Sequence, residues 1–111
     1  MKIGVMSTGP TLEHFVGALV KRSGYLLIID LETMRYLSAQ NPVHSLSGPT
    51  AGRLFAQLLV QSGVNAILTG NCDPNIRQTL CKAGVQVVSG KTGIVYKIVE
   101  GFKRSCQSAV S

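Results

Sequence analysis

The chain has 111 residues, of which 45% are hydrophobic and 14% are charged, and these proportions fit one globular domain rather than a disordered chain. Its formal net charge of +6 favours an anionic partner such as nucleic acid, phosphate or an anionic metal cluster. No apolar run is long enough to span a bilayer, and no signal peptide is visible at the N-terminus. We therefore expect a cytoplasmic protein with no membrane partner.

The first half of the chain predicts a strand, a helix and a hairpin. The apolar run from Lys2 to Met6 has strand character and ends in a turn sequence. Between Thr11 and Arg22 the apolar residues recur at helical spacing, which predicts a short amphipathic helix. Tyr25 to Asp30 reads as a strand buried on both faces, and Met34 to Ala39 reads as its antiparallel partner.

The second half alternates helices with strands. Its clearest helix begins at Pro49 and is terminated by Gly63. The other predicted elements are a strand over Val64–Leu68, a helix over Asn75–Lys82, a strand over Val85–Val88 and a helix over Thr92–Phe102. We expect one domain over residues 1–102, followed by a flexible C-terminal tail over residues 103–111.

This order of elements predicts an α/β fold with a mixed five-stranded sheet, made of an antiparallel hairpin and parallel strands and flanked by helices. Three strands end in small loops that contain glycine: Ser7-Thr8-Gly9, Thr69-Gly70-Asn71-Cys72 and Ser89-Gly90-Lys91. If those strands are neighbours, the loops line one edge of the sheet. Ligands of open α/β sheets bind at such strand ends, so we place the functional site there.

Cys72 is the sharpest functional clue, because it lies in the turn between a strand and a helix. Asp73 can cap that helix, and Pro74 suits its first position. A free cysteine is usually a small buried residue without a reactive role. A helix N-terminus lowers the pKa of a thiol, whereas the carboxylate of Asp73 works against this. The local sequence therefore leaves both an inert thiol and a thiolate ligand or nucleophile open.

The chain contains two histidines, which are further candidate ligands for a metal. His14 falls on the polar side of its predicted helix, and His44 lies in the loop before the clearest helix, which would bring it toward the same sheet edge. With Cys72 they form a sparse set suited to soft metals or iron–sulfur species. Their spacing matches no recognised metal motif.

Other constellations give little support to an enzyme. The five carboxylates are spread over turns and helix ends, whereas a two-metal nuclease needs several at one centre. The three cysteines include no Cys-x2-Cys pair and indicate neither a disulfide framework nor a structural zinc site. Ser89-Gly90-Lys91-Thr92 looks like the end of a P-loop, but Gly84 stands one place away from the position that this motif requires. We therefore expect no enzymatic activity.

Taken together, these motifs resemble the dinitrogenase iron–molybdenum cofactor biosynthesis family over about Met1 to Phe102. The resemblance is carried by the opening Met-Lys-Ile strand, the Leu26–Asp30 strand with its hairpin, Asn41-Pro42 followed by His44, Gly63-Val64-Asn65-Ala66 leading into Gly70-Asn71, and Ala83-Gly84-Val85-Gln86-Val87. It implies a ribonuclease-H-like three-layer fold without nuclease activity, and a role in binding or carrying iron–sulfur or iron–molybdenum cofactor species. By this resemblance, Cys72 stands in the glycine–asparagine loop where some family members have cysteine, and His44 stands in the loop before the main helix.

The resulting hypothesis is a non-enzymatic carrier of an anionic iron–sulfur or iron–molybdenum-type cluster. Cys72 would be a metal ligand, and His44 is the second candidate. The other expected cofactor-binding residues are Gly9, Gly70, Asn71 and Gly90, whose loops would supply backbone donors. Expected partners are cofactor-assembly or acceptor proteins, with a homodimer as a further candidate. The alternatives are a structural or regulatory interaction module without cargo and, less favoured, nucleic-acid binding through the basic surface.

Overall fold

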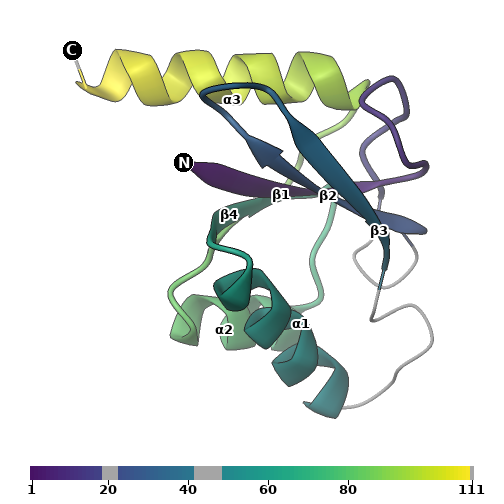
Figure 1. Ribbon diagram of the computed structural model, residues 1–111. Coiled ribbons are helices and arrows are strands. Elements are labelled where there is room, and N and C mark those ends of the chain that lie inside the picture. Colours follow the sequence, from purple (N-terminus) through teal and green to yellow (C-terminus); the bar gives the residue numbers. More distant parts are fainter. Residues whose placement is uncertain (19–22, 42–48, 111) are drawn as a thin grey trace.

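The protein forms one α/β domain, seen in the computed structural model in Figure 1, which describes residues 1–18, 23–41 and 49–110. The elements are β1 (Lys2–Ser7), β2 (Tyr25–Asp30), β3 (Tyr36–Gln40), α1 (Pro49–Gln61), β4 (Val64–Leu68), α2 (Pro74–Lys82), β5 (Gln86–Val88) and α3 (Val95–Val110). No helix within these ranges is long and apolar enough to cross a membrane.

The five strands form one mixed sheet in the order β3-β2-β1-β4-β5. The hairpin of β2 and β3 is antiparallel, and β2 is also antiparallel to β1. By contrast, β4 lies parallel to β1 and to β5. The predicted mixed five-stranded sheet is therefore confirmed, and β1, β4 and β5 are neighbours whose C-terminal ends lie at the same edge.

Helices cover both faces of the sheet and produce three layers (Figure 1). The core between the sheet and the pair α1 and α2 includes Met6, Leu26, Phe55, Leu59, Ile67 and Leu80. The core between the sheet and α3 includes Ile3, Val5, Leu27, Ile29, Leu68, Val95 and Val99. Alternate residues of β1 and β2 enter opposite cores, as the two-residue period of a strand requires. The three-layer arrangement of the predicted fold is confirmed, while the ribonuclease-H-like label stays a prediction.

The predicted helix over Thr11–Arg22 is wrong for the part of it that the structure describes, residues 11–18. These residues turn and then form short bridges to two other segments, Ser7 with Val16 and Phe15 with Ile94. The amide of Gly17 donates to Met6 O at 2.7 Å, and the amide of Val16 donates to Gly93 O at 2.9 Å. Hydrogen bonds to distant segments thus replace the i to i−4 bonds of a helix. A helix this short is marginal on its own, so tertiary contacts decide its conformation.

Several boundaries differ from the sequence prediction, and two of these differences have a physical explanation. In the hairpin, β3 begins at Tyr36 rather than at Met34, because Met34 has a left-handed backbone (φ 60°) and belongs to the turn. At the C-terminus, α3 continues to Val110, so residues 103–110 are helical where we expected a tail. No proline or glycine follows Gly101 to interrupt the helix. The domain boundary at residue 102 stays a prediction.

Candidate functional site at the strand ends

The loops after β1, β4 and β5, residues 8–9, 69–73 and 89–93, form what we call the strand-end site. Backbone hydrogen bonds join the second and third loops: the amide of Gly90 donates to Gly70 O at 2.5 Å, and the amide of Lys91 donates to Thr69 O at 3.1 Å. The segment that follows the first loop is also joined to this site, because the amide of Gly70 donates to Gly17 O at 3.0 Å. The expected meeting of the loops at one edge is therefore observed.

Gly70 is needed because another backbone comes very close to it. A Cβ atom at this position would lie 2.9 Å from both Cα and O of Ala18. Real side chains do not tolerate such a distance to a backbone that is itself held by hydrogen bonds. The buried hydroxyl of Thr69 strengthens the same region by donating to Asn71 O at 3.2 Å. At the strand-end site, the backbone of residue 70 is therefore packed tightly against the backbone of residues 17–18.

The backbone N–H groups that we expected to hold an anion are bonded within the protein. Gly9 N donates to Ser7 Oγ at 3.2 Å. Asn71 N donates to Ala18 O at 2.7 Å, and the amides of Gly70 and Gly90 are engaged as described above. These four amides thus have hydrogen-bond partners within the protein. The binding of a cofactor by Gly9, Gly70, Asn71 and Gly90 stays a prediction.

Cys72 lies in the loop between β4, which ends at Leu68, and α2, which begins at Pro74. Its thiol is half-buried and packs against the core beneath α1 and α2. The pKa of Cys72 is raised above that of an ordinary thiol, and burial is the largest cause. The positive charge of Arg77 lowers this pKa, whereas Asp73 and, to a smaller extent, Cys81 raise it. The thiol is therefore protonated at neutral pH, and a metal that binds it must displace the proton.

The turn after Cys72 has the local structure that the sequence predicted. Asp73 is the N-cap of α2, and its Oδ1 accepts a hydrogen bond from the amide of Asn75 at 3.0 Å. Pro74 occupies the start of the helix, where no amide donor is required. Because the carboxylate of Asp73 already occupies the N-terminus of α2, that terminus offers little attraction to a second anion.

Arg77 is a residue of the strand-end site that sequence reasoning missed. Its guanidinium donates to Ser89 Oγ at 2.6 Å and so connects α2 to the loop after β5. The sequence held only a weak signal, namely that Arg77 lies on the first turn of the helix that follows Cys72. With Lys91 on the neighbouring loop, Arg77 gives this part of the site a positive charge.

The two histidines have different outcomes. His44 lies outside the described residues, so its role stays a prediction. His14 lies beside Gly9, and its Nδ1 is 2.8 Å from Thr11 Oγ1. Within the described residues, no group of three or more His, Cys, Asp or Glu side chains could hold a metal ion. The described part of the strand-end site therefore presents the thiol of Cys72, with the imidazole of His14 beside Gly9.

These features define a small three-layer α/β protein with a thiol and basic side chains at the ends of its parallel strands. The family model described as "Dinitrogenase iron-molybdenum cofactor" matches residues 1–105, and the chain belongs to this family. The family that the resemblance predicted is thereby confirmed. No curated protein matches the sequence.

Solved structures agree with this assignment. The apo form of the orange protein from Desulfovibrio gigas is 30% identical, with a TM-score of 0.83 over 94% of this chain and 88% of that one. A putative NifB protein from Thermotoga, solved by NMR, is 27% identical, with a TM-score of 0.74 over 93% of this chain and 87% of that one. The chain thus spans nearly the full length of both relatives.

Proposed function

We propose that this protein binds and carries an iron–sulfur or iron–molybdenum-type cluster, without catalysing a reaction. The cargo binds at the strand-end site, and a cofactor-assembly or acceptor protein exchanges it. Membership of a family named for the iron–molybdenum cofactor supports a cofactor-related role. The observation that carries the proposal is the position of Cys72, a half-buried thiol at the end of a central strand, with the charge of Arg77 within electrostatic reach.

The residues of the strand-end site fit one kind of cargo better than others. A thiolate is a soft ligand and suits copper, iron–sulfur and related sulfide-bridged species. Arg77 and Lys91 attract an anion, in agreement with the net charge of +6. Because the described residues supply no set of three metal ligands, the cluster must keep most of its own sulfide ligands or obtain others from a second chain. His44 remains the second proposed ligand, and Gly9, Gly70, Asn71 and Gly90 shape the site.

Anaerobic loading of the purified protein tests this proposal. Wild type, Cys72→Ala and Cys81→Ala would each receive iron and sulfide, or an isolated iron–molybdenum cofactor, followed by desalting and measurement of the retained visible absorption. Cys81 is a matched control, because it is an exposed cysteine on α2 that lies outside the strand-end site. We expect the wild type and Cys81→Ala to retain chromophore and Cys72→Ala to lose most of it.

The remaining outcomes separate the alternatives. If Cys72→Ala retains as much chromophore as the wild type, Cys72 is not a ligand, and His44→Ala becomes the variant to compare. If no protein retains chromophore, the family fold serves here as a structural or regulatory interaction module. The engagement of the loop amides in internal hydrogen bonds is the observation that favours this second function.

A further inference from the structure

β3 is an edge strand of the sheet, at the end of the strand order opposite β5. Within the described residues β3 pairs with β2 alone, and all five of its residues are exposed. Proteins usually protect such an edge with a charged residue or a proline, but Tyr36–Gln40 contains neither. Leu37, the second residue of β3, is 74% exposed. This edge therefore has the properties of a surface that accepts another strand.

The hydrogen bonds of the hairpin show which backbone groups are free to pair. Arg35 O accepts from the amide of Asp30 at 2.9 Å, and the amide of Asn41 donates to Gly24 O at 3.0 Å. Successive residues of an antiparallel strand direct their N–H and C=O groups to opposite sides. Since residues 35 and 41 point toward β2, the backbone groups of Tyr36, Ser38 and Gln40 point away from the sheet.

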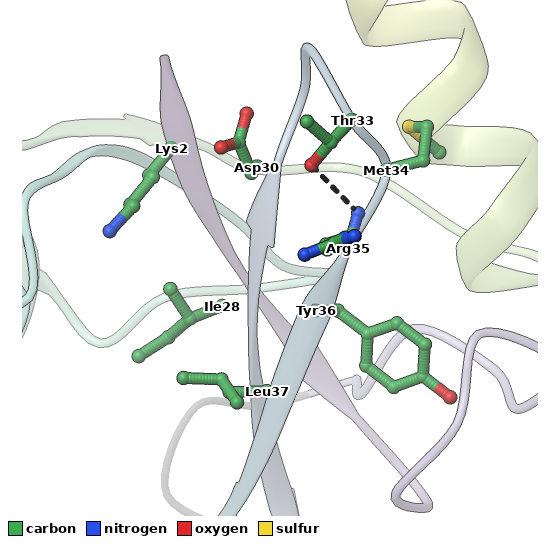
Figure 2. A pocket seen from close by; sticks show the side chains of 8 residues that line it. All are labelled: Lys2, Ile28, Asp30, Thr33, Met34, Arg35, Tyr36 and Leu37. Atoms are coloured by element: carbon green, nitrogen blue, oxygen red, sulfur yellow. Dashed lines mark hydrogen bonds between the residues drawn. The ribbon is translucent and has the colours of Figure 1, made fainter.

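A pocket of about 600 Å³ lies beside this edge, and its lining includes Lys2, Ile28, Asp30, Arg35 and Leu37 (Figure 2). Ile28 and Leu37 are directly opposite each other in the register of β2 and β3, so they form an apolar patch on one face. Asp30 is the register partner of Lys2, and its Oδ1 accepts a hydrogen bond from the amide of Glu32 at 2.9 Å, so its charge offsets one of the two cations and leaves the other in excess. Neither Lys2 nor Arg35 forms an ion pair with another described residue.

We propose that β3 docks an extended segment of a partner protein, which adds to the sheet as a sixth strand. The outward backbone groups of Tyr36, Ser38 and Gln40 would pair with the backbone of this segment. An apolar side chain of the segment would cover Leu37 and Ile28, and a carboxylate near one end would meet Lys2 and Arg35. The partner is therefore an acidic, apolar peptide segment in extended conformation.

A second copy of the chain fits this edge less well. Antiparallel pairing of two β3 strands about Ser38 would place Arg35 opposite Asn41 of the partner subunit. The turns of the two hairpins would then lie at opposite ends of the pair, so the carboxylates in one turn would be remote from Lys2 and Arg35 of the other copy. Two chains that each carry a charge of +6 also repel each other. An acidic segment satisfies the cations that a second copy would leave unpaired.

A peptide with blocked ends, acetyl-Glu-Thr-Val-Thr-Val-Thr-Glu-amide, serves as the probe. Its glutamates and valines share one face of a strand, and a glutamate reaches Arg35 in either direction of pairing. Binding would be measured by calorimetry and by NMR shifts of the β3 amides. The matched variants are Ser38→Pro, which removes an outward N–H without touching the bonds to β2, and Ser38→Ala, which keeps that N–H.

We expect the wild type and Ser38→Ala to bind the probe alike, and Ser38→Pro to bind it at least roughly tenfold more weakly. The same peptide with lysine in place of glutamate should bind several-fold more weakly to the wild type. If Ser38→Pro does not fold, a double variant with Lys2→Gln and Arg35→Gln should remove the preference for glutamate over lysine.

Three results would overturn the proposal. Equal binding of the probe to folded Ser38→Pro and Ser38→Ala would show that the edge of β3 is not the docking site. Equal binding of the lysine and glutamate peptides to the wild type would show that the partner is not acidic. Dimerisation of the wild type that Ser38→Pro abolishes, and with which the probe competes, would identify a second copy as the occupant.

Discussion

The imidazole of His14 occupies the space that a side chain on residue 9 would need. A Cβ atom on Gly9 would overlap the Cγ, Cδ2 and Nε2 atoms of the ring. The ring is held in place by the contact of its Nδ1 with Thr11 Oγ1, at 2.8 Å. Glycine at position 9 is thus explained by packing against His14, and its amide, bonded to Ser7 Oγ, has a structural role.

Replacement of this glycine tests the contact. We expect Gly9→Ala to lower the free energy of unfolding by about 1–2 kcal/mol, because the methyl group must displace the ring of His14 and break its contact with Thr11. In a His14→Ala background the same replacement should cost clearly less, so the two changes are coupled in a double-mutant cycle. Urea unfolding of the wild type, the two single variants and the double variant measures the four free energies of unfolding. Additive effects would show that the ring does not restrict residue 9.

The reactivity of Cys72 should follow the charges around it. Burial raises the pKa of Cys72, so its alkylation by iodoacetamide should accelerate with pH up to a midpoint above that of an ordinary thiol. Arg77 lowers this pKa, and Arg77→Gln should therefore raise it and slow alkylation at pH 8, by roughly two- to fivefold. Asp73 raises the pKa, so Asp73→Asn should accelerate the reaction.

Cys81 provides an internal reference for this measurement, because it is exposed on the same helix and its modification is distinguished by peptide mass spectrometry. Its rate should change much less than that of Cys72 in both variants. If Arg77→Gln accelerated the alkylation of Cys72, then access to the buried thiol rather than the charge of Arg77 would control its reactivity.

The parts of the fold that depend on local chemistry could be predicted from the sequence. Asp73 and Pro74 define the start of α2 through a local hydrogen bond and a fixed backbone angle. Gly63, whose φ is 76°, lies in the turn that terminates α1, as expected. The segment over residues 11–18 could not be predicted, because its amide partners lie in distant segments such as Met6 and Gly93.

The same distinction applies to the strand-end site. Cys72 was found from the turn in which it lies. Its electrostatic partner Arg77 and the contact of Arg77 with Ser89 depend on how α2 packs beside β5, which no local pattern encodes. The sequence also suggested free backbone donors at Gly9, Gly70 and Gly90, since glycine-rich loops often bind anions. Here these donors bond to Ser7, Gly17 and Gly70 of the same chain.

The N-cap of α2 makes a measurable contribution to stability. Asp73 Oδ1 accepts the amide hydrogen bond of Asn75, so Asp73→Ala should lower the free energy of unfolding by about 1 kcal/mol. Asp73→Asn keeps a capping oxygen and should lower the free energy of unfolding by only about 0.3 kcal/mol. Urea unfolding at pH 6, where the thiol of Cys72 remains protonated, separates the capping effect from the effect on that thiol. Equal losses in the two variants would show that the charge of Asp73, rather than its capping bond, stabilises the fold.

Two glycines with opposite surroundings provide the last prediction. A Cβ atom on Gly70 would lie 2.9 Å from the backbone of Ala18, whereas one on Gly101, within α3, would meet nothing within 4 Å. Gly70→Ala should therefore destabilise the protein by about 1–3 kcal/mol, since two hydrogen-bonded loops must move apart. Gly101→Ala should stabilise it by about 0.5–1 kcal/mol, because alanine loses less backbone entropy in a helix. Thermal unfolding of both variants decides the matter: a stable Gly70→Ala protein would mean that residues 17–18 do not pack against the strand-end site in solution.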